Sequence, residues 1–154
     1  MKKLLIGFFI ILLLFFGLLL QRRLAMPEPT GLGATNGRLS ACPERPNCVS
    51  SFAEGEEHRI EPLTLVGTPA EAMAKIKQAL EAMPRIVIVD ASDHYLHAEA
   101  TSLIYRYVDD LEVLIDADNG KIHLRSASRT GYSDLGVNRN RVQALADAYT
   151  GSGR

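Results

Sequence analysis

The chain begins with an uninterrupted apolar run. Residues 4–20 include no charged or polar side chain. Two basic residues stand on each side of the run: Lys2, Lys3, Arg22 and Arg23. As a helix, these 17 residues would be roughly 25 Å long, a little under the ~30 Å hydrocarbon core of a bilayer. The pattern predicts that residues 1–25 form an N-terminal transmembrane helix, which serves as an uncleaved single-pass membrane anchor.

Two other interpretations of the same run stay open. A cleaved signal peptide requires small residues directly after the apolar run, whereas Gln21, Arg22 and Arg23 follow here. A lipoprotein signal requires a lipid-attached cysteine next to the run, but the nearest such sequence, residues 39–42, lies about twenty residues downstream. The flanking residues therefore favour the anchor over both alternatives.

Beyond the apolar run, the hydrophobic periodicity predicts a single domain over residues 42–150. Residues 26–41 show no periodicity and begin with a stretch rich in Pro, Gly and Thr, which is typical of a tether. Alternating apolar residues predict a strand at 58–66. A helix follows, with the capping-box pattern at residues 68–71 and an end at Pro84. The buried stripe expected for this helix is Met73, Ile76, Leu80 and Met83.

Four further strands and a second helix complete the predicted domain. The strands span residues 85–91, 94–101, 103–117 and 121–128. Asn119-Gly120, between the last two strands, is a strong hairpin signal. The final helix covers about residues 138–149, and residues 151–154 are expected to be a disordered tail. The order β-α-β-β-β-β-α predicts an α+β fold, in which a mainly antiparallel sheet carries two helices on one face.

The composition of the whole chain is less informative than the composition of its separate parts. The whole chain is 47% hydrophobic and has a formal net charge of −1. Residues 26–154 carry 13 basic and 18 acidic side chains, a net charge of −5, which disfavours nucleic acid as a partner. Residues 121–154 have a net charge of +4 and residues 26–120 a net charge of −9. We therefore expect these two stretches to attract each other in the fold.

The only two cysteines stand in a short loop that contains two prolines. Cys42 and Cys48 enclose Pro43 and Pro46, which stiffen the segment. The even count, the close spacing and the preceding apolar run favour a structural disulfide, with a redox pair or reduced thiols as alternatives. A disulfide places the domain on the extracytoplasmic, periplasmic side. Two thiolates do not fill the four positions of a zinc site, so no metal is expected here.

The predicted hairpin assigns side chains to two faces. With a two-residue loop at Asn119 and Gly120, Asp110 would face Arg129 across the strands. The apolar face would hold Leu111, Val113, Ile115, Ile122 and Leu124, and the polar face Arg106, Asp110, Glu112 and Arg125. The same alternation puts Asp109 on the apolar face. A carboxylate there requires an Arg partner or several hydrogen bonds, or its pKa must rise.

Basic, acidic and hydroxyl side chains gather toward the C-terminal end of the domain. The candidate ligand-binding residues are Arg106, Asp109, Asp110, Arg125, Ser126, Ser128, Arg129, Ser133, Asp134, Asn138, Arg139 and Arg141. Guanidinium and hydroxyl donors favour a small anionic molecule, or an envelope protein, as partner. The structural alternative is an ion-pair network that ties the last loop and helix to the hairpin. The motifs indicate no catalytic residue, metal or cofactor.

The same segments carry a resemblance to a known family. They are Cys42-Pro43, residues 46–51, Asp109-Asp110, residues 125–129 and residues 131–141. In these segments the chain resembles the DUF1499 family, a domain of unknown function, over roughly residues 42–149. The resemblance implies a domain boundary but no activity. The leading hypothesis is a membrane-tethered binding domain without catalytic activity. The alternatives are an acid/base enzyme that uses Asp109 or Asp110, and a purely structural cell-envelope factor.

Overall fold

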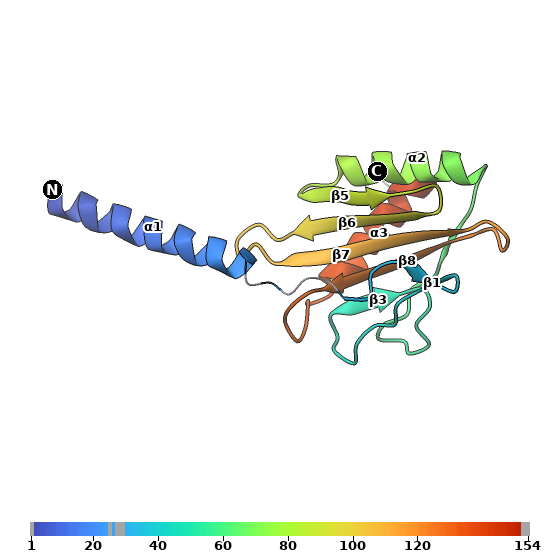
Figure 1. The fold of residues 1–154 in the computed structure, drawn as a ribbon, viewed down its shortest axis with the longest axis horizontal. Coiled ribbons are helices and arrows are strands. Elements are labelled where there is room, and N and C mark those ends of the chain that lie inside the picture. The colour runs from blue at the N-terminus through green and yellow to red at the C-terminus, as the bar shows by residue number, and fades with distance from the viewer. Residues whose placement is uncertain (1, 25, 27–29, 152–154) are drawn as a thin grey trace.

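The N-terminal apolar run is helical. The computed structural model describes residues 2–24, 26 and 30–151, and in it α1 (Lys2–Leu24) extends away from the rest of the chain (Figure 1). Among the described residues, no helix is long and apolar enough to cross a membrane. The prediction of a transmembrane helix is therefore wrong on this point, because the apolar run of 17 residues falls short of the ~20 that usually span a bilayer. The predicted disordered tail lies almost entirely outside the described residues.

A six-stranded antiparallel sheet forms the centre of the domain (Figure 1). Its strands run in the order β3, β8, β7, β6, β5, and β4 pairs with β8. The strands are β3 (Cys48–Ser50), β4 (Leu63–Thr64), β5 (Ile86–Ala91), β6 (Tyr95–Thr101), β7 (Val108–Asp116) and β8 (Lys121–Ser128). A separate pair, β1 (Ala34–Thr35) and β2 (Arg38–Leu39), lies in the N-terminal segment. The predicted α+β fold with an antiparallel sheet is confirmed.

Two helices, α2 (Pro69–Ala82) and α3 (Val137–Thr150), pack on one face of the sheet. The capping box of α2 is present: the Thr68 amide donates to Glu71 Oε2 at 2.8 Å, and the Glu71 amide donates to Thr68 Oγ1 at 3.3 Å. Of the predicted stripe, Met83 is only partly buried, and the other three residues are buried. The apolar side chains of α2, α3 and the inward positions of the sheet form one core, as the periodicity predicts.

Two predicted strands are shorter in the structure. In the stretch 58–66, only β4 is extended, because Pro62 has no amide to donate to a neighbouring strand. In the stretch 103–117, β7 begins only at Val108. Arg106 adopts a left-handed backbone with a φ of 57°, which interrupts the extended conformation before β7.

The β7–β8 hairpin is joined by four residues instead of the predicted two. Asp116 faces Lys121, so the register differs by two residues from the prediction. The Asp116 carboxylate explains the longer turn, since Oδ1 accepts from the Asn119 amide at 3.1 Å and Oδ2 from the Asn119 side chain at 2.8 Å. A shift of two residues keeps every side chain on its face, so the predicted apolar face of the hairpin is confirmed.

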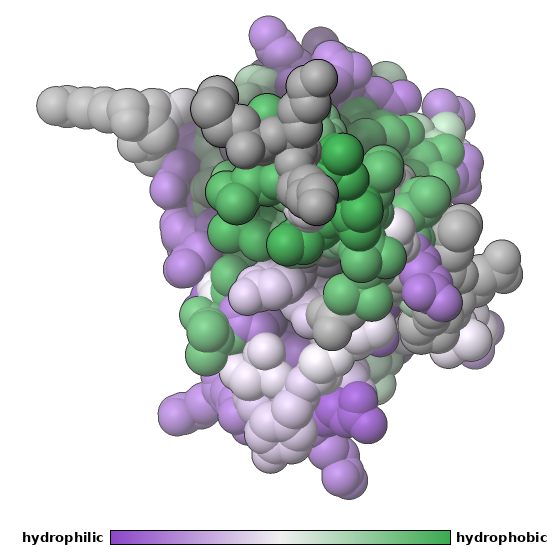
Figure 2. Space-filling view, turned by 90° about the vertical axis from the view of Figure 1, so that its left-hand side faces the viewer, coloured by the Kyte–Doolittle hydropathy of each residue, from purple (hydrophilic) through white to green (hydrophobic). Residues whose placement is uncertain are grey.

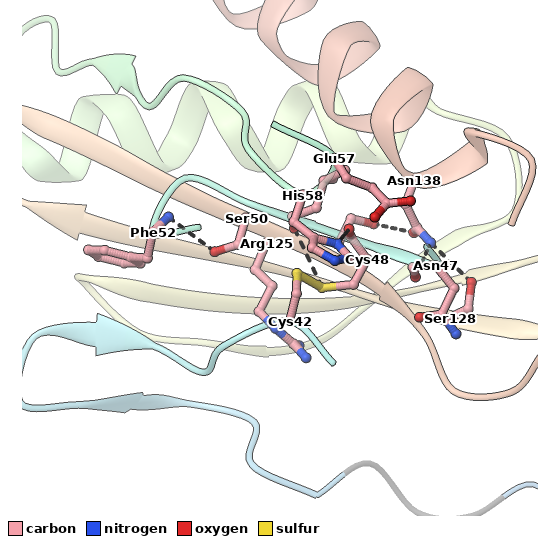
Figure 3. The surroundings of a disulfide bond; sticks show 12 residues. Cys42, Asn47, Cys48, Ser50, Phe52, Glu57, His58, Arg125, Ser128 and Asn138 are labelled. Atoms are coloured by element: carbon pink, nitrogen blue, oxygen red, sulfur yellow. Dashed lines mark hydrogen bonds between the residues drawn. A yellow bond between two sulfur atoms is a disulfide. The ribbon is translucent and has the colours of Figure 1, made fainter. Parts of the chain in front are cut away.

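The sheet face opposite the helices is covered by the N-terminal segment, residues 30–47. Leu39 of β2 is buried there, and the Gly33 amide donates to side chains of the sheet. A disulfide joins Cys42 to Cys48, with the two Cα atoms 5.6 Å apart, which ties this segment to β3 (Figure 3). The predicted disulfide is thus confirmed. Closing so short a loop contributes somewhat under ~3 kcal/mol in the chain-entropy model.

Candidate functional site

Successive side chains of β7 point to opposite faces of the sheet, so two neighbouring carboxylates, Asp109 and Asp110, lie on opposite sides. Asp109 lies on the helix side, where the Arg141 guanidinium donates to its Oδ2 at 2.7 Å. Asp110 lies on the other side, where the His97 ring nitrogen Nε2 is 2.8 Å from its Oδ1. The sheet therefore separates the two carboxylates, and they cannot work as one acid/base pair.

Asn138, in the first turn of α3, is the centre of a polar network on the helix side. It is fully buried, and its Oδ1 accepts from the Ser126 hydroxyl at 2.6 Å. Its Nδ2 donates to Ser128 Oγ at 3.0 Å and to the Asn47 carbonyl at 3.1 Å (Figure 3). One side chain thereby joins α3 to β8 and to the residue that precedes β3. The helix-side network comprises Asp109, Ser126, Ser128, Asn138 and Arg141.

Arg141 connects the same network to β7. Besides Asp109, it donates to Ser126 Oγ at 3.1 Å and to Asn138 Oδ1. The guanidinium and the Asp109 carboxylate are both almost buried. An Arg partner is one of the three possibilities that the sequence leaves for a carboxylate on the apolar face, and it comes from the final helix.

The loop before α3 is held by its own polar side chains. Asp134 accepts from the Gly136 amide at 3.0 Å and from the Asn138 amide at 2.8 Å, which satisfies free amides at the start of the helix. Ser133 Oγ accepts from the Leu135 amide at 3.2 Å. Arg139 donates to the backbone carbonyls of Glu56, Glu57 and Arg59, at 2.8 Å for the last two. These candidate residues therefore bind the protein's own backbone.

Asp110 belongs to an outer-face network that comprises His97, Glu99, Asp110 and Arg129. Arg129 follows β8 directly and donates to Asp110 through Nε at 3.0 Å and through Nη2 at 2.8 Å. The same Nη2 donates to Glu99. Asp110 and Arg129 thus meet as predicted, although Ala127 and not Arg129 is the residue opposite Asp110 in the sheet.

A second buried ion pair lies next to it on the outer face. Glu112 is fully buried, and its Oε2 accepts from Arg125 Nη1 at 2.7 Å. Its Oε1 accepts from the Tyr95 hydroxyl at 2.9 Å and from the Gly33 amide at 2.8 Å. Arg125 Nε is buried without a hydrogen-bond partner in the described part of the chain. The remaining candidate, Arg106, lies in the loop before β7 and belongs to neither network.

The outer-face contacts shift the pKa values of their members. Burial would raise the pKa of Asp110, but hydrogen bonds from His97 and Arg129 outweigh it and hold the pKa below its ordinary value. The hydrogen bond to Asp110 likewise raises the pKa of Arg129, despite its burial. Burial and the neighbouring Glu112 carboxylate raise the pKa of Tyr95. Asp110 therefore stays ionised and Tyr95 protonated at neutral pH.

The lowered pKa of Asp110 predicts a loss of stability in acid. Above the unfolded-state pKa of about 3.9, ionised Asp110 stabilises the folded chain, and this contribution is lost as the pH falls through the folded-state pKa. Urea unfolding at a series of pH values below about 4 should show a shallower decline for Asp110→Asn than for the parent. Equal slopes for the two proteins would contradict the role given to Asp110.

The described residues also line an open hollow with a volume of about 760 Å³ at the end of the sheet nearest α1, which we call the end cavity. It lies between the β6–β7 loop, the end of β8 and the loop before α3. Its polar base includes Asp109 and Ser128, and its apolar rim includes Tyr105, Tyr107, Leu135 and Val137. Figure 2 looks at this side of the molecule, where α1 extends toward the viewer and its exposed apolar side chains gather at the centre.

The end cavity contains four of the predicted candidates and adds residues that were not predicted. Asp109, Ser128, Ser133 and Asp134 line it, whereas no Lys or Arg of the described chain does. The sequence pattern does not predict this rim, because Tyr105 and Tyr107 lie in the predicted strand 103–117, and Leu135 and Val137 lie outside the predicted elements. The spacing of Tyr105 and Tyr107 in the sequence was a usable signal, since the two residues would share one face of a strand.

The fold and these contacts define an α+β domain whose C-terminal polar residues are mostly paired with one another. The chain belongs to the family described as "Protein of unknown function (DUF1499)", whose sequence profile matches residues 38–148. No curated protein matches the chain. The matched region begins at β2 and includes the disulfide, both polar networks and nearly all of α3. The resemblance inferred from the sequence is therefore confirmed.

Proposed function

We propose that the chain is an extracytoplasmic binding domain that holds a small molecule in the end cavity. The observation that carries this proposal is the cavity itself, in which a polar base lies behind an apolar rim. Ligand sites are typically hollows of several hundred Å³ with mostly apolar walls and a few placed polar groups. The disulfide supports the extracytoplasmic location, because such bonds persist in oxidising compartments.

The pairing of the arginines argues against the anion site expected from the sequence. Arg125, Arg129 and Arg141 each donate to a carboxylate of the chain at 2.7 to 3.0 Å. An anion would have to displace these carboxylates and leave them buried without partners, which is costly. The same contacts give no support to an enzyme that uses Asp110 as a general acid, because Asp110 is ionised and covered.

Phenol is a suitable first probe of the end cavity, because it combines a small aromatic body with one hydroxyl. Titrated into the full chain, it should shift the methyl NMR signals of Leu135 and Val137 saturably. Tyr105→Ala should weaken this binding about fivefold by removing an aromatic wall, whereas Leu103→Ala, in the same loop but outside the cavity, should not. Shifts that do not saturate, or that both substitutions affect equally, would refute the proposed site.

A further inference from the structure

The end cavity also indicates which chemical class of ligand it takes, an inference that rests on the proposed function. We infer that it binds an uncharged amphiphile: a molecule with an apolar or aromatic body and a hydroxyl-bearing head. We expect the apolar rim to contact the apolar body of the ligand and the polar base to bind its hydroxyl group. Three features carry this inference, namely the exposed rim, the free hydrogen-bonding capacity of the base, and the charge balance around it.

The rim offers an unusually exposed apolar surface. Leu135 is 91% exposed, and Tyr105 and Tyr107 are stacked with their ring centroids 5.8 Å apart. Leu135 and Arg106 have left-handed backbones, with φ values of 55° and 57°, one in each of the two loops beside the cavity. Non-glycine residues rarely adopt this conformation, and such residues cluster at functional sites, although Asn36 and Arg85 also adopt it outside the cavity. An apolar body placed against this rim would remove its side chains from water.

At the base of the end cavity, Asp109 has one oxygen atom that can still accept a hydrogen bond, and Ser128 has one hydrogen atom that can still be donated. Among the described residues, only Arg141 donates to Asp109, and it does so at Oδ2, so that Oδ1 is left to accept. Ser128 Oγ accepts from Asn138 Nδ2, and its hydroxyl hydrogen remains available to donate. Asp109 and Ser128 face each other across β7 and β8, so a ligand hydroxyl between them would donate to Asp109 and accept from Ser128. A carboxylate head can only accept, and an ammonium head can only donate.

The charges around the base favour an uncharged head. The Asp109 carboxylate is already paired with the Arg141 guanidinium. Asp134, the other carboxylate of the lining, accepts two backbone amides at the start of α3, where the helix dipole favours negative charge. Neither carboxylate is left to compensate a ligand cation, and no described Lys or Arg lines the cavity to compensate an anion. At the base of the hollow, either ion would give up part of its hydration without a counter-charge.

Three probes with one body and different heads test this inference: 2-phenylethanol, 2-phenylethylamine and phenylacetate. Each is titrated into the full chain at neutral pH, and binding is followed at the methyl signals of Leu135 and Val137. These signals separate the cavity from any contact that the probes make with the exposed apolar surface of α1. We expect 2-phenylethanol to bind about tenfold more tightly than either ion, because only its head matches both groups of the base.

The possible outcomes distinguish a wrong ligand class from a wrong binding site. If an ion binds as tightly as 2-phenylethanol, or if phenol binds and 2-phenylethanol does not, the ligand class is overturned while the site stands. If neither phenol nor any of the three probes binds saturably at these methyl signals, the proposed function fails together with the ligand class.

Discussion

Replacement of Glu112 by Ala is expected to lower the free energy of unfolding by about 3–5 kcal/mol. Glu112 is fully buried and is the carboxylate partner of Arg125, whose Nε already has no partner in the described structure. The substitution leaves a buried guanidinium without a counter-charge, and it also removes the acceptor of the Tyr95 hydroxyl and one of the two acceptors of the Gly33 amide. Urea unfolding monitored by circular dichroism measures this change.

Glu61→Ala is the matched control for this experiment. Glu61 also pairs with an arginine, Arg59, at 2.9 Å, but the two side chains are 76% and 56% exposed. Exposed pairs of this kind contribute about 0–1 kcal/mol, so the control should unfold almost like the parent. If Glu112→Ala and Glu61→Ala have equally small effects, the outer-face ion pair does not stabilise the fold.

Asn138→Ala is expected to lower the free energy of unfolding by about 2–4 kcal/mol. Its amide joins α3 to Ser126, Ser128 and the Asn47 carbonyl, and no water can replace a fully buried group without rearrangement. The substitution leaves several buried polar atoms with fewer partners. Thermal and urea unfolding of the purified variant measure the effect.

Asn140 provides the comparison on the same helix, because it lies two residues further along and is exposed. Asn140→Ala should change the free energy of unfolding by less than about 0.5 kcal/mol. Two variants of equal stability would show that Asn138 does not fasten α3 to the sheet.

The elements with strong local signals could be predicted from the sequence. The capping box and the apolar stripe of α2 depend on neighbouring residues, and both are present in the structure. The hairpin register was displaced by two residues because a side-chain contact of Asp116 decides the loop length, and pattern alone does not report such a contact. The short strand β3 pairs with the distant β8, which leaves no local periodicity, and β1 and β2, which pair with each other, are too short at two residues each to show any.

The candidate site could be predicted only in part. Alternation along β7 predicts the correct face for Asp109, and its burial there predicts an Arg partner, several hydrogen bonds or a raised pKa, of which the structure shows the Arg partner. The choice of Arg141 as that partner depends on how α3 packs, which the sequence does not reveal. The candidate residues share one region of the sequence, but the sheet divides them between two faces. Half of the apolar rim, Tyr105 and Tyr107, comes from a loop where the pattern predicts a strand.

The most direct test of this account is the dissociation constant of 2-phenylethanol for two variants of the full chain. Ser128→Ala changes the base of the end cavity, whereas Arg129→Lys changes the outer-face network on the other side of the sheet. The account predicts about tenfold weaker binding for Ser128→Ala, the effect of one lost hydrogen bond, and unchanged binding for Arg129→Lys. Unchanged binding in Ser128→Ala together with weakened binding in Arg129→Lys would contradict it.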